Sequence, residues 1–570
     1  MLCFNRLVAA ALAVALAVPP AAFGQQLSDA PPSDGPPLEI GPLNSSVISL
    51  VPPGIASGVF GPYGSKDSRL AGGNGTANGN ASLRAPLTAV QLPDLGDGSG
   101  GALTLQEERK VGERVMRQVR RGPGYLADWL TRDYLNSVAA RLAAAASAQY
   151  IGGYKPDFQL FAIRDPQINA FSMPGGFIGI NTGLFVTTQT ESELASVIGH
   201  EMGHVLQRHI ARMIAVNERS GYAALAGVLF GILAGMIANS GDLGSAIVLG
   251  GHAYAVDEQL RFSRAAEHEA DRVGFQMLAA AGYDPYGMPS FFERLERASM
   301  SDAGVPAYAR THPLTTDRLA DIEDRARRAP YRQPRQSPEF GFVRARLRVL
   351  QDRSPSEYAG DVRRFTAEIE DKTAPNVAAN WYGIAVAQML IGRYDAADAA
   401  LDKARRIFTA DEVQEGEVAR SSPSLDVLAS DIARRAGRAD DAVRLGEIAQ
   451  RRWPGSHAAI DIHLQALLAA RRFADAQALA LQATRADPDE PAWWRYLARA
   501  SAGAGDALAQ HRATAEALAL EGAWPSAVRQ LKAARDIEAI DFYDLSIVKA
   551  RLHEFEARYK AEREDERNMR

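Results

Sequence analysis

The C-terminal part of the chain repeats with a period of about 34 residues. Asp426, Ile460 and Trp494 occupy the same phase, and Trp381 opens the series after a longer first interval. Small residues recur where paired helices would touch, which is typical of tetratricopeptide repeats. Such helix pairs bury their apolar faces against their neighbours, so we expect a curved α-solenoid with a concave binding face over residues 336–555. A plain helical bundle is the alternative.

The N-terminus has the three parts of a secretory signal peptide. Arg6 supplies a positive charge, Leu7 to Val18 form an apolar stretch, and Ala22-Phe23-Gly24 offers small residues for cleavage. We therefore predict a signal peptide over residues 1–24 and an exported mature chain. Cys3 is the only cysteine and would be removed with it, so no disulfide within the chain is expected. An uncleaved membrane anchor is the alternative.

Amino-acid composition distinguishes a linker from the globular part of the chain. Residues 25–101 are rich in Pro, Gly, Asn and Ser and show no sustained period, so we expect a disordered linker. The whole chain, with 46% hydrophobic and 23% charged residues, has the composition of an ordinary globular protein, and its net charge of −5 gives no basic footprint for nucleic acid. Order should begin near Leu103, where Thr104 and Glu107 form a capping box.

Short strands follow the first helices. Phe158 to Ile163 alternates in character, and Phe177 to Asn181 forms a second short strand after a glycine-rich turn. Gly175, Gly176 and Gly179 weaken a strand interior but permit the close approach of another backbone. A glycine-bent strand without any ligand is the alternative.

The next helix carries metal-binding chemistry. Thr190 to Glu193 is a capping box, which predicts a helix start just before the apolar run Leu194 to Ile198. One and a half turns later the same helix carries His200-Glu201-Met202-Gly203-His204. Positions four apart share one helical face, so His200 and His204 can point at one zinc ion. Glu201 beside them can take a proton from a water molecule that the metal makes acidic. Two surface histidines and an unrelated glutamate are the alternative.

A third ligand is expected from a later charged helix. Glu267 and Asp271 are four residues apart, so Glu267 can bind the metal while Asp271 accepts a hydrogen bond from a ligand histidine or shuttles a proton. His268 is the rival ligand, although it points about 100° away on the helix. Glu269 is expected to be an ordinary solvated charge. A charged helix face without a site is the alternative.

Four motif blocks together resemble the HtpX/BepA family of zinc metallopeptidases, which are relatives of the CAAX prenyl protease. The segment Leu92 to Gly96 resembles the soluble periplasmic BepA branch of that family. The resemblance implies that His200, His204 and Glu267 bind zinc, that Glu201 is the catalytic base, and that Asp271 is a proton donor or supports a ligand. The blocks span residues 92 to 330 and are Asn169-Ala170-Phe171 with Pro174-Gly175-Gly176 and Thr182-Gly183-Leu184, His200-Glu201-x-x-His204 with Arg208-His209, Glu267-x-Glu269-Ala270-Asp271, and Thr311-His312-Pro313.

The same resemblance suggests a role for His312. In the BepA branch a histidine between threonine and proline can occupy the fourth zinc position and keep the enzyme latent. A fourth protein ligand displaces the water that must attack the peptide, so this role is chemically reasonable. Stabilising the oxyanion or capping a loop is the alternative role for His312.

An uncharged segment lies between the two expected ligand helices. Residues 222–238 are at the lower limit of length for a membrane span, and residues 243–251 are much too short to return across a bilayer. We expect a buried or membrane-touching helical hairpin over residues 222–251, with a true membrane span as the alternative. An exposed apolar patch there would suit apolar clients.

The predicted architecture is mainly α with a small β-sheet. A gluzincin-type HExxH metalloprotease domain over residues 102–335 precedes the tetratricopeptide repeats, and a charged tail covers residues 556–570. We predict that each chain binds one zinc ion. The predicted protein is a periplasmic, membrane-associated endopeptidase that cleaves misfolded or misassembled envelope proteins. Its predicted partners are unfolded outer-membrane proteins, the β-barrel assembly machinery through the repeats, and the membrane surface through residues 222–251.

Two further hypotheses concern binding. The alternative function is a chaperone-like binding protein whose zinc is latent or structural, although an intact Glu201 favours the protease. A substrate strand is expected to pair along an open sheet edge formed by Phe177 to Asn181, with the glycines leaving room for its backbone.

Overall fold

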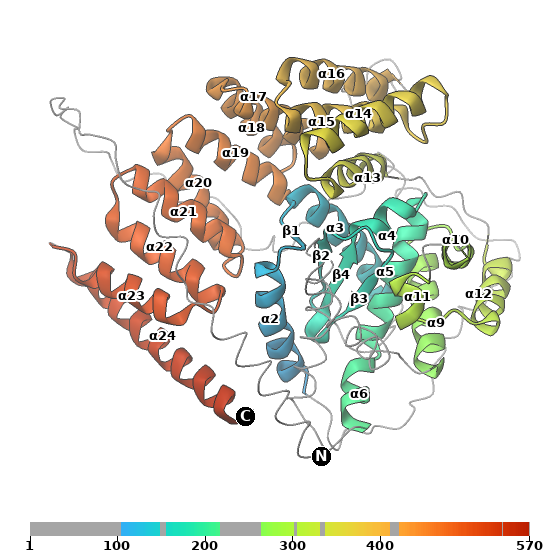
Figure 1. The fold of residues 1–570 in the computed structure, drawn as a ribbon. Helices are drawn as coiled ribbons and strands as arrows, with labels where there is room; N and C mark the ends of the chain where they lie inside the picture. The colour runs from blue at the N-terminus through green and yellow to red at the C-terminus, as the bar shows by residue number, and fades with distance from the viewer. Residues whose placement is uncertain are drawn as a thin grey trace, which may run out of the picture. The chain divides into compact units, whose positions relative to one another are not determined.

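A computed structural model describes residues 104–148, 156–216, 264–300, 305–330, 337–410, 421–538 and 540–568. The predicted signal peptide, the linker and the apolar hairpin at 222–251 lie outside these residues. No helix in the described ranges is both long enough and apolar enough to cross a membrane. Helices dominate, and one small four-stranded sheet accompanies them (Figure 1), which confirms the predicted fold class.

The sheet has the strand order β1-β2-β4-β3. Its strands are β1 (Tyr125–Leu126), β2 (Gln159–Ile163), β3 (Ala170–Ser172) and β4 (Phe177–Asn181). β4 pairs in parallel with β2 and antiparallel with β3, so both of its sides are occupied. The prediction that Phe177 to Asn181 forms an open edge is therefore wrong. The end strand on this side of the described sheet is β3.

The glycines near β4 make room for the chain itself. A Cβ atom at Gly179 would lie 2.3 Å from the ring of Phe171 on β3. Gly175 and Gly176 have positive φ angles of 79° and 89°, and a Cβ at Gly175 would lie 2.7 Å from the Cα of Arg109. The close approach predicted from these glycines exists, but a neighbouring part of the chain occupies the space that was expected for a substrate backbone.

Helices cover both faces of the sheet. One face packs on α2 (Leu105–Arg121), where Phe161 and Phe177 join Val115 and Val119 in an apolar cluster. The other face belongs to a larger core that includes α3 (Trp129–Ala148) and α5 (Glu191–Leu206). α2 begins with the predicted capping box at Thr104. The other helices of this part are α4 (Thr182–Thr187), α6 (His209–Val216), α9 (Arg264–Ala280), α10 (Gly287–Ser299), α11 (Ala307–Thr311) and α12 (Thr316–Arg328).

α5 starts at the predicted N-cap but with half of the predicted capping box. The Thr190 hydroxyl accepts a hydrogen bond from the Glu193 backbone N–H. The Glu193 carboxylate, however, accepts from the Gln189 N–H at 2.7 Å and pairs with Arg294 on α10 at 2.9 Å. The Glu193 carboxylate, which the capping-box pattern predicts to bond to the backbone of Thr190, instead forms an ion pair with Arg294 of another helix.

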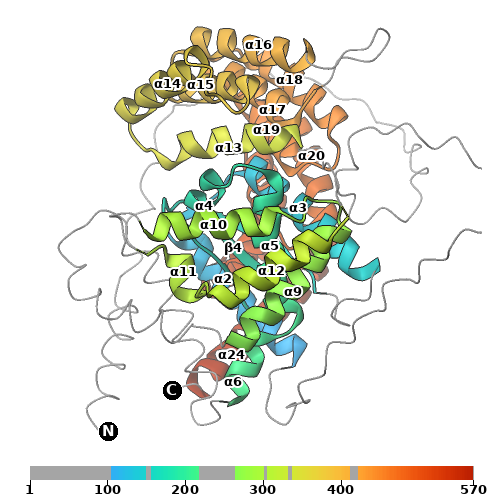
Figure 2. The ribbon, with the colours of Figure 1, turned by 90° about the vertical axis from the view of Figure 1, so that its right-hand side faces the viewer.

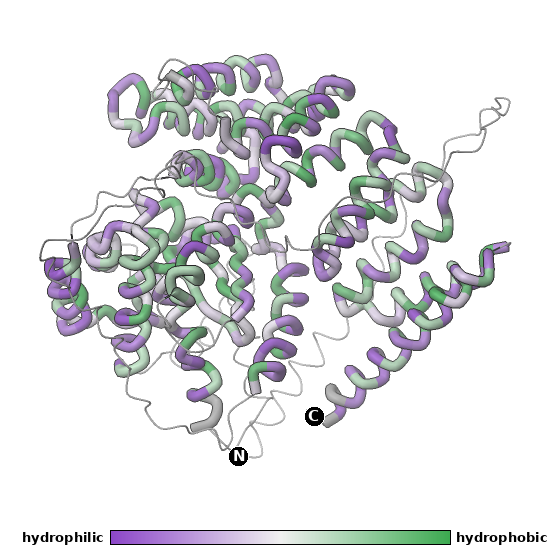
Figure 3. Tube along the Cα trace, turned by 180° about the vertical axis from the view of Figure 1, so that it is seen from behind, coloured by the Kyte–Doolittle hydropathy of each residue, from purple (hydrophilic) through white to green (hydrophobic). Residues whose placement is uncertain are grey.

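Helices of 12 to 17 residues follow one another from α14 to α23, and the 27-residue α24 ends the series. Polar and apolar stretches alternate along these helices (Figure 3). α17, α19 and α21 begin at Pro423, His457 and Pro491, one repeat period apart, as the sequence pattern requires. This part is a helical repeat region. Its helices are α14 (Pro355–Glu370), α15 (Val377–Ile391), α16 (Tyr394–Ala410), α17 (Pro423–Arg435), α18 (Ala439–Arg452), α19 (His457–Ala469), α20 (Phe473–Ala486), α21 (Pro491–Gly503), α22 (Ala507–Leu520), α23 (Trp524–Arg535) and α24 (Phe542–Asn568).

The turns between paired repeat helices share one backbone conformation. Gly437, Arg471 and Gly505 stand one repeat period apart, and all three have φ angles between 57° and 78°. Glycine adopts this left-handed conformation without steric cost, whereas arginine at position 471 does not. The segment predicted as a charged tail, residues 556–570, continues α24 as far as Asn568.

α13 (Pro338–Gln351) lies between the sheet-containing part and the repeats (Figures 1 and 2). It follows the predicted domain boundary at residue 335, and it contributes to two hydrophobic cores at once. Its opposite faces are buried in different clusters. Phe340, Val343 and Leu347 belong to the core around α3 and α5, and Phe342, Ala345 and Val349 belong to the core of α15 and α16.

Candidate metal centre

Small residues bring the two ligand helices into backbone contact. A Cβ atom at Gly203 on α5 would lie 2.9 Å from the carbonyl oxygen of Ala270 on α9. On the other helix, a Cβ at Gly274 would lie 2.8 Å from the backbone nitrogen of His200. Because these positions lack side chains, α9 approaches closely enough for Glu267 to reach the histidines of α5.

Four side chains meet at this contact and form a group that could hold a metal ion. His200 and His204 lie on α5 and Glu267 lies on α9. His312 is the C-cap residue that directly follows α11. Each is at most 3% exposed. The structure thus brings together the residues that the sequence predicts as ligands, and it adds His312 to the same donor group.

The distances between donor atoms fit a zinc ion. His200 Nε2 lies 3.0 Å from His204 Nε2 and 3.4 Å from His312 Nδ1. Glu267 Oε1 lies 3.0 Å from His312 Nδ1 and 3.5 Å from His204 Nε2. Tetrahedral zinc with bond lengths of about 2.0–2.1 Å needs donors roughly 3.3 Å apart. Nitrogen and carboxylate oxygen are also the donors that zinc accepts in proteins.

Glu201 lies beside this group and is completely buried. Its Oε1 is 3.5 Å from His312 Nε2, so the carboxylate faces the donor set. Among the described residues, neither of its oxygens accepts a hydrogen bond. A buried carboxylate without such partners is costly in a merely structural role, which supports a role as proton acceptor.

Asp271 contacts His200 at the ring nitrogen that does not face the donor group. Its Oδ1 is 2.9 Å from His200 Nδ1, which leaves Nε2 of the ring for a metal. Arg318 donates to both oxygens of Asp271, at 2.7 and 2.8 Å. Burial would raise the pKa of Asp271, but Arg318 and His200 lower it below its ordinary value. Of the two roles predicted for Asp271, these contacts favour orienting His200 over shuttling a proton.

Arg318 is a part of the site that the sequence patterns do not reveal. It is only 2% exposed, lies 2.8 Å from Glu267 Oε2, and donates to the carbonyl of Pro313 at 2.9 Å. It therefore ties the ligand carboxylate and Asp271 to the segment that carries His312. Its place shortly after His312 is visible in the sequence, but a buried arginine has no periodic pattern that separates it from a surface one.

A second chain of contacts supports His204. His209 Nδ1 lies 2.8 Å from His204 Nδ1, and its Nε2 lies 3.0 Å from Glu269. Glu269 also accepts from Arg212 at 2.7 Å, so the expectation that it is an ordinary solvated charge is wrong. Burial lowers the pKa of His209 in spite of Glu269. His268, the rival ligand, is not part of the donor group found among the described residues.

Within the described residues, a sheet lies beside two antiparallel helices that carry a His-His-Glu-His donor set, and a buried glutamate that accepts no hydrogen bond lies next to this set. These features define the class of metal-dependent peptidases. The sequence model of peptidase family M48 matches residues 130–326. The metalloprotease LoiP of Escherichia coli is 30% identical over 191 residues, which is 33% of this chain and 70% of that protein. The chain belongs to peptidase family M48, as its motif blocks indicate.

Other relatives carry a more specific name. A beta-barrel assembly-enhancing protease of Yersinia pestis is 34% identical over 310 residues, and a putative one of Vibrio cholerae is 35% identical over 271 residues. These matches cover 54% and 48% of this chain. They span 61% and 53% of the two relatives, so the chain matches little more than half the length of each.

Proposed function

We propose that the chain is a zinc-dependent endopeptidase that cleaves unfolded or misassembled proteins of the bacterial envelope. The observation that carries this proposal is the buried carboxylate of Glu201, which has no hydrogen-bond donor among the described residues and faces four metal-binding side chains. Bound zinc supplies Lewis acidity that polarises a peptide carbonyl and makes water acidic. Glu201 then accepts a proton from the attacking water and delivers it to the leaving amine.

His312 makes the resting enzyme latent in this proposal. Its Nδ1 lies in the donor set, which supports the role of a fourth ligand over that of an oxyanion stabiliser. The ring stacks on Tyr308, with centroids 4.6 Å apart and planes at 27°, and its backbone N–H donates to the Tyr308 carbonyl at 2.8 Å. If all four side chains held zinc, no open position would remain for substrate, so His312 would have to move away on activation.

Substrate strands would add to β3, since β4 is paired on both sides. Asn181 donates to the Asn169 carbonyl at 3.0 Å, and Met173 donates to the Phe177 carbonyl at 2.8 Å. In an antiparallel ladder the residues between such pairs direct their N–H and C=O groups away from the partner. The main-chain groups of Ala170 and Ser172 therefore point to the side opposite β4. Both residues are at most 7% exposed, so a strand would add there only after this edge is uncovered.

The substrate class and location rest on several supports. The relatives are named for β-barrel assembly, and unfolded β-barrel strands are extended chains that an edge strand accepts. The signal-peptide pattern supports export to the periplasm. The repeat period supports tetratricopeptide repeats that bind clients or the β-barrel assembly machinery and so assist assembly. The second candidate, a chaperone-like protein with latent zinc, is supported by the placement of His312 in the donor set.

Digestion of unfolded casein by wild type and Glu201→Gln separates the two functions. We expect the variant to lose activity by a factor of at least about 10² while its zinc content stays at one per chain. Glu293→Gln on the surface of α10 is the matched control, because Glu293 is half exposed and pairs only weakly with Arg297. Equal casein digestion by wild type and Glu201→Gln would exclude the protease, and suppression of aggregation of an unfolded outer-membrane protein would then identify the binding protein.

A further inference from the structure

Three successive repeats contact α3 or α13 through the same position of the repeat. Ser422, Ser456 and Glu490 are the N-cap residues of α17, α19 and α21, and they stand one repeat period apart. Each N-cap residue or its immediate neighbours bonds to a charged side chain of α3 or α13. The beginnings of these three helices thus form one docking surface.

Glu339 on α13 holds the first of the three helix ends. Its carboxylate, on a residue only 8% exposed, accepts hydrogen bonds from the hydroxyl of Ser422 and, at 2.7 Å, from that of Ser424. Burial raises the pKa of Glu339, and these hydroxyl donors oppose the rise. Both of these donors are neutral hydroxyls, so the contact consists of hydrogen bonds and is not an ion pair.

α3 holds the other two helix ends. Asp133 accepts from the Ser456 hydroxyl at 2.9 Å and from the Ala458 backbone N–H at 3.0 Å, and it lies 2.7 Å from His457 Nδ1. The neighbouring Arg132 pairs with Glu490 at 2.6 Å. One turn of α3 therefore fixes both α19 and α21.

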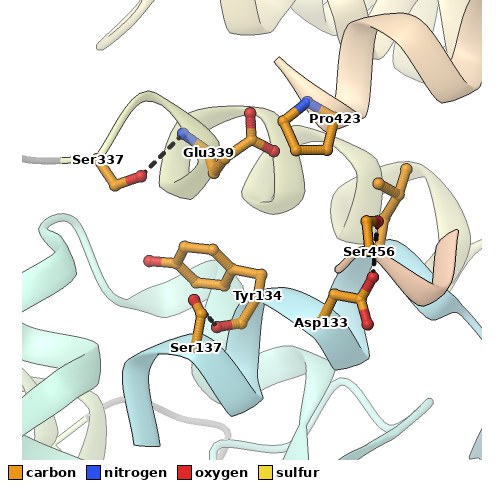
Figure 4. A pocket seen from close by; sticks show the side chains of 8 residues that line it. Asp133, Tyr134, Ser137, Ser337, Glu339, Pro423 and Ser456 are labelled. Carbon is orange, nitrogen blue, oxygen red and sulfur yellow. Dashed lines mark hydrogen bonds between the residues drawn. The ribbon is translucent and has the colours of Figure 1, made fainter. Parts of the chain in front are cut away.

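A small cavity lies among these docks. It has a volume of about 40 Å³, which is room for a few water molecules and not for an organic ligand. Figure 4 shows Asp133 and Tyr134 together on α3 below Glu339 of α13, with Ser456 beside Asp133. Asp133 and Glu339, which hold the starts of two repeat helices, thus line the same cavity as Tyr134.

Tyr134 and the start of α13 both bond to the first residue of the ligand helix α5. The Tyr134 hydroxyl donates to Glu191 Oε1 at 2.9 Å, and the backbone N–H of Ser337 donates to Glu191 Oε2 at 2.8 Å. Glu191 is 3% exposed, and burial raises its pKa against these two bonds. It precedes His200 by two and a half turns of continuous helix, a distance of roughly 14 Å.

We propose that Glu191 is a positioning residue through which docking of the repeats on Asp133 and Glu339 sets the placement of α5 and its metal ligands. The proposal rests on the proposed protease function and names how that site is regulated. The buried carboxylate of Glu191 loses stabilising free energy if it is separated from either the Tyr134 hydroxyl or the Ser337 N–H. Helix α5 is therefore displaced when α3 or α13 moves. An intact helix transmits that displacement to its ligand residues. A client that shifts α17 or α19 would thereby change turnover without touching the site.

A double-mutant cycle tests this coupling. Asp133→Asn weakens the α19 dock, Tyr134→Phe removes one bond to Glu191 while keeping the ring, and the double variant combines them. We expect each single change to lower kcat for casein about five-fold with KM unchanged. The double variant should match a single variant rather than show the roughly 25-fold loss of independent sites. Each variant should also change the visible absorption of the Co²⁺-substituted protein, which reports ligand geometry.

Arg117→Gln is the matched control, because it breaks another contact between the two parts of the chain. Arg117 on α2 pairs with Glu562 on α24 at 2.8 Å, and this pair lies outside the dock formed by α3 and α13. We expect wild-type kcat and an unchanged Co²⁺ spectrum. If Asp133→Asn unfolds, Ser456→Ala removes a single donor of the same dock and replaces it in the cycle.

Two outcomes would overturn the coupling. One is an additive loss in the double variant, and the other is a wild-type Co²⁺ spectrum in folded single variants. Failure of the protease function looks different, because then the wild type itself would show no zinc-dependent digestion of casein.

Discussion

Replacing Asp271 with asparagine tests how the buried charges hold the metal ligands. In the native site one oxygen of Asp271 faces His200 Nδ1 and both oxygens accept from Arg318. Asparagine offers only one acceptor oxygen. If that oxygen serves His200, the amide NH₂ faces the donors of Arg318, and if the amide turns around, His200 is pushed into the wrong tautomer.

The magnitude follows from the bonds that are lost. Hydrogen bonds to charged groups contribute about 1.5–3 kcal/mol each, so the loss of one or two of those from Arg318 costs about 3 kcal/mol. That agrees with the cost of about 3–5 kcal/mol for leaving a buried charge without its partner. Loss of a contact that orients a ligand histidine lowers metal affinity by about 10–100-fold, or about 1.4–2.7 kcal/mol.

Zinc affinity measured by competition with a chromophoric chelator, together with chemical unfolding, gives both quantities. Asp321→Asn is the matched control. Asp321 also joins α12 to α9 through Arg272, at 3.6 Å, but this pair is on the surface, so the change should cost less than about 1 kcal/mol and leave zinc binding unchanged. If Asp271→Asn binds zinc as tightly as the wild type, the argument that Asp271 orients His200 fails.

Three further predictions concern different parts of the chain. His312→Ala should raise casein turnover several-fold because it removes the fourth ligand; a lower rate would instead support the oxyanion role, and an unchanged rate would remove both roles. Arg471→Gly should raise the free energy of unfolding by about 0.5–1 kcal/mol in urea titrations, because glycine adopts the left-handed turn without strain; a lower midpoint contradicts this. Burial raises the pKa of Asp461 from 3.8 to about 6, so its contribution to stability is complete below about pH 4 and is lost as pH rises through 6. Asp461→Asn should remove this loss, on the order of 2–3 kcal/mol between about pH 4 and pH 8, and identical pH profiles for variant and wild type would refute it.

The meeting of His200, His204 and Glu267 in one donor group could be predicted because it follows local rules. His200 and His204 share a helical face by spacing alone, and Glu267 falls on a helix that the sequence also indicates. The repeat period likewise predicts the helix starts, as the even spacing of Pro423, His457 and Pro491 shows.

The parts that could not be predicted depend on contacts between distant segments. Arg318 and Glu269 look like surface charges in the sequence, and only the packing of α12 and α6 against α9 makes them part of the site. The interior position of β4 is hidden because strand order cannot be inferred from two short apolar runs. The ring of Phe171 fills the space above Gly179, and that contact exists only once β3 has paired with β4.

The position of α13 has a consequence for how the protein is made. A chain synthesised from its N-terminus cannot complete the core around α5 until Phe340, Val343 and Leu347 have emerged and folded back onto it. By then the other face of the same helix requires α15 and α16 to cover it. A chain cut before α13 therefore leaves the core behind the metal site open, so we expect fragments released by premature termination to lack a stable metal site.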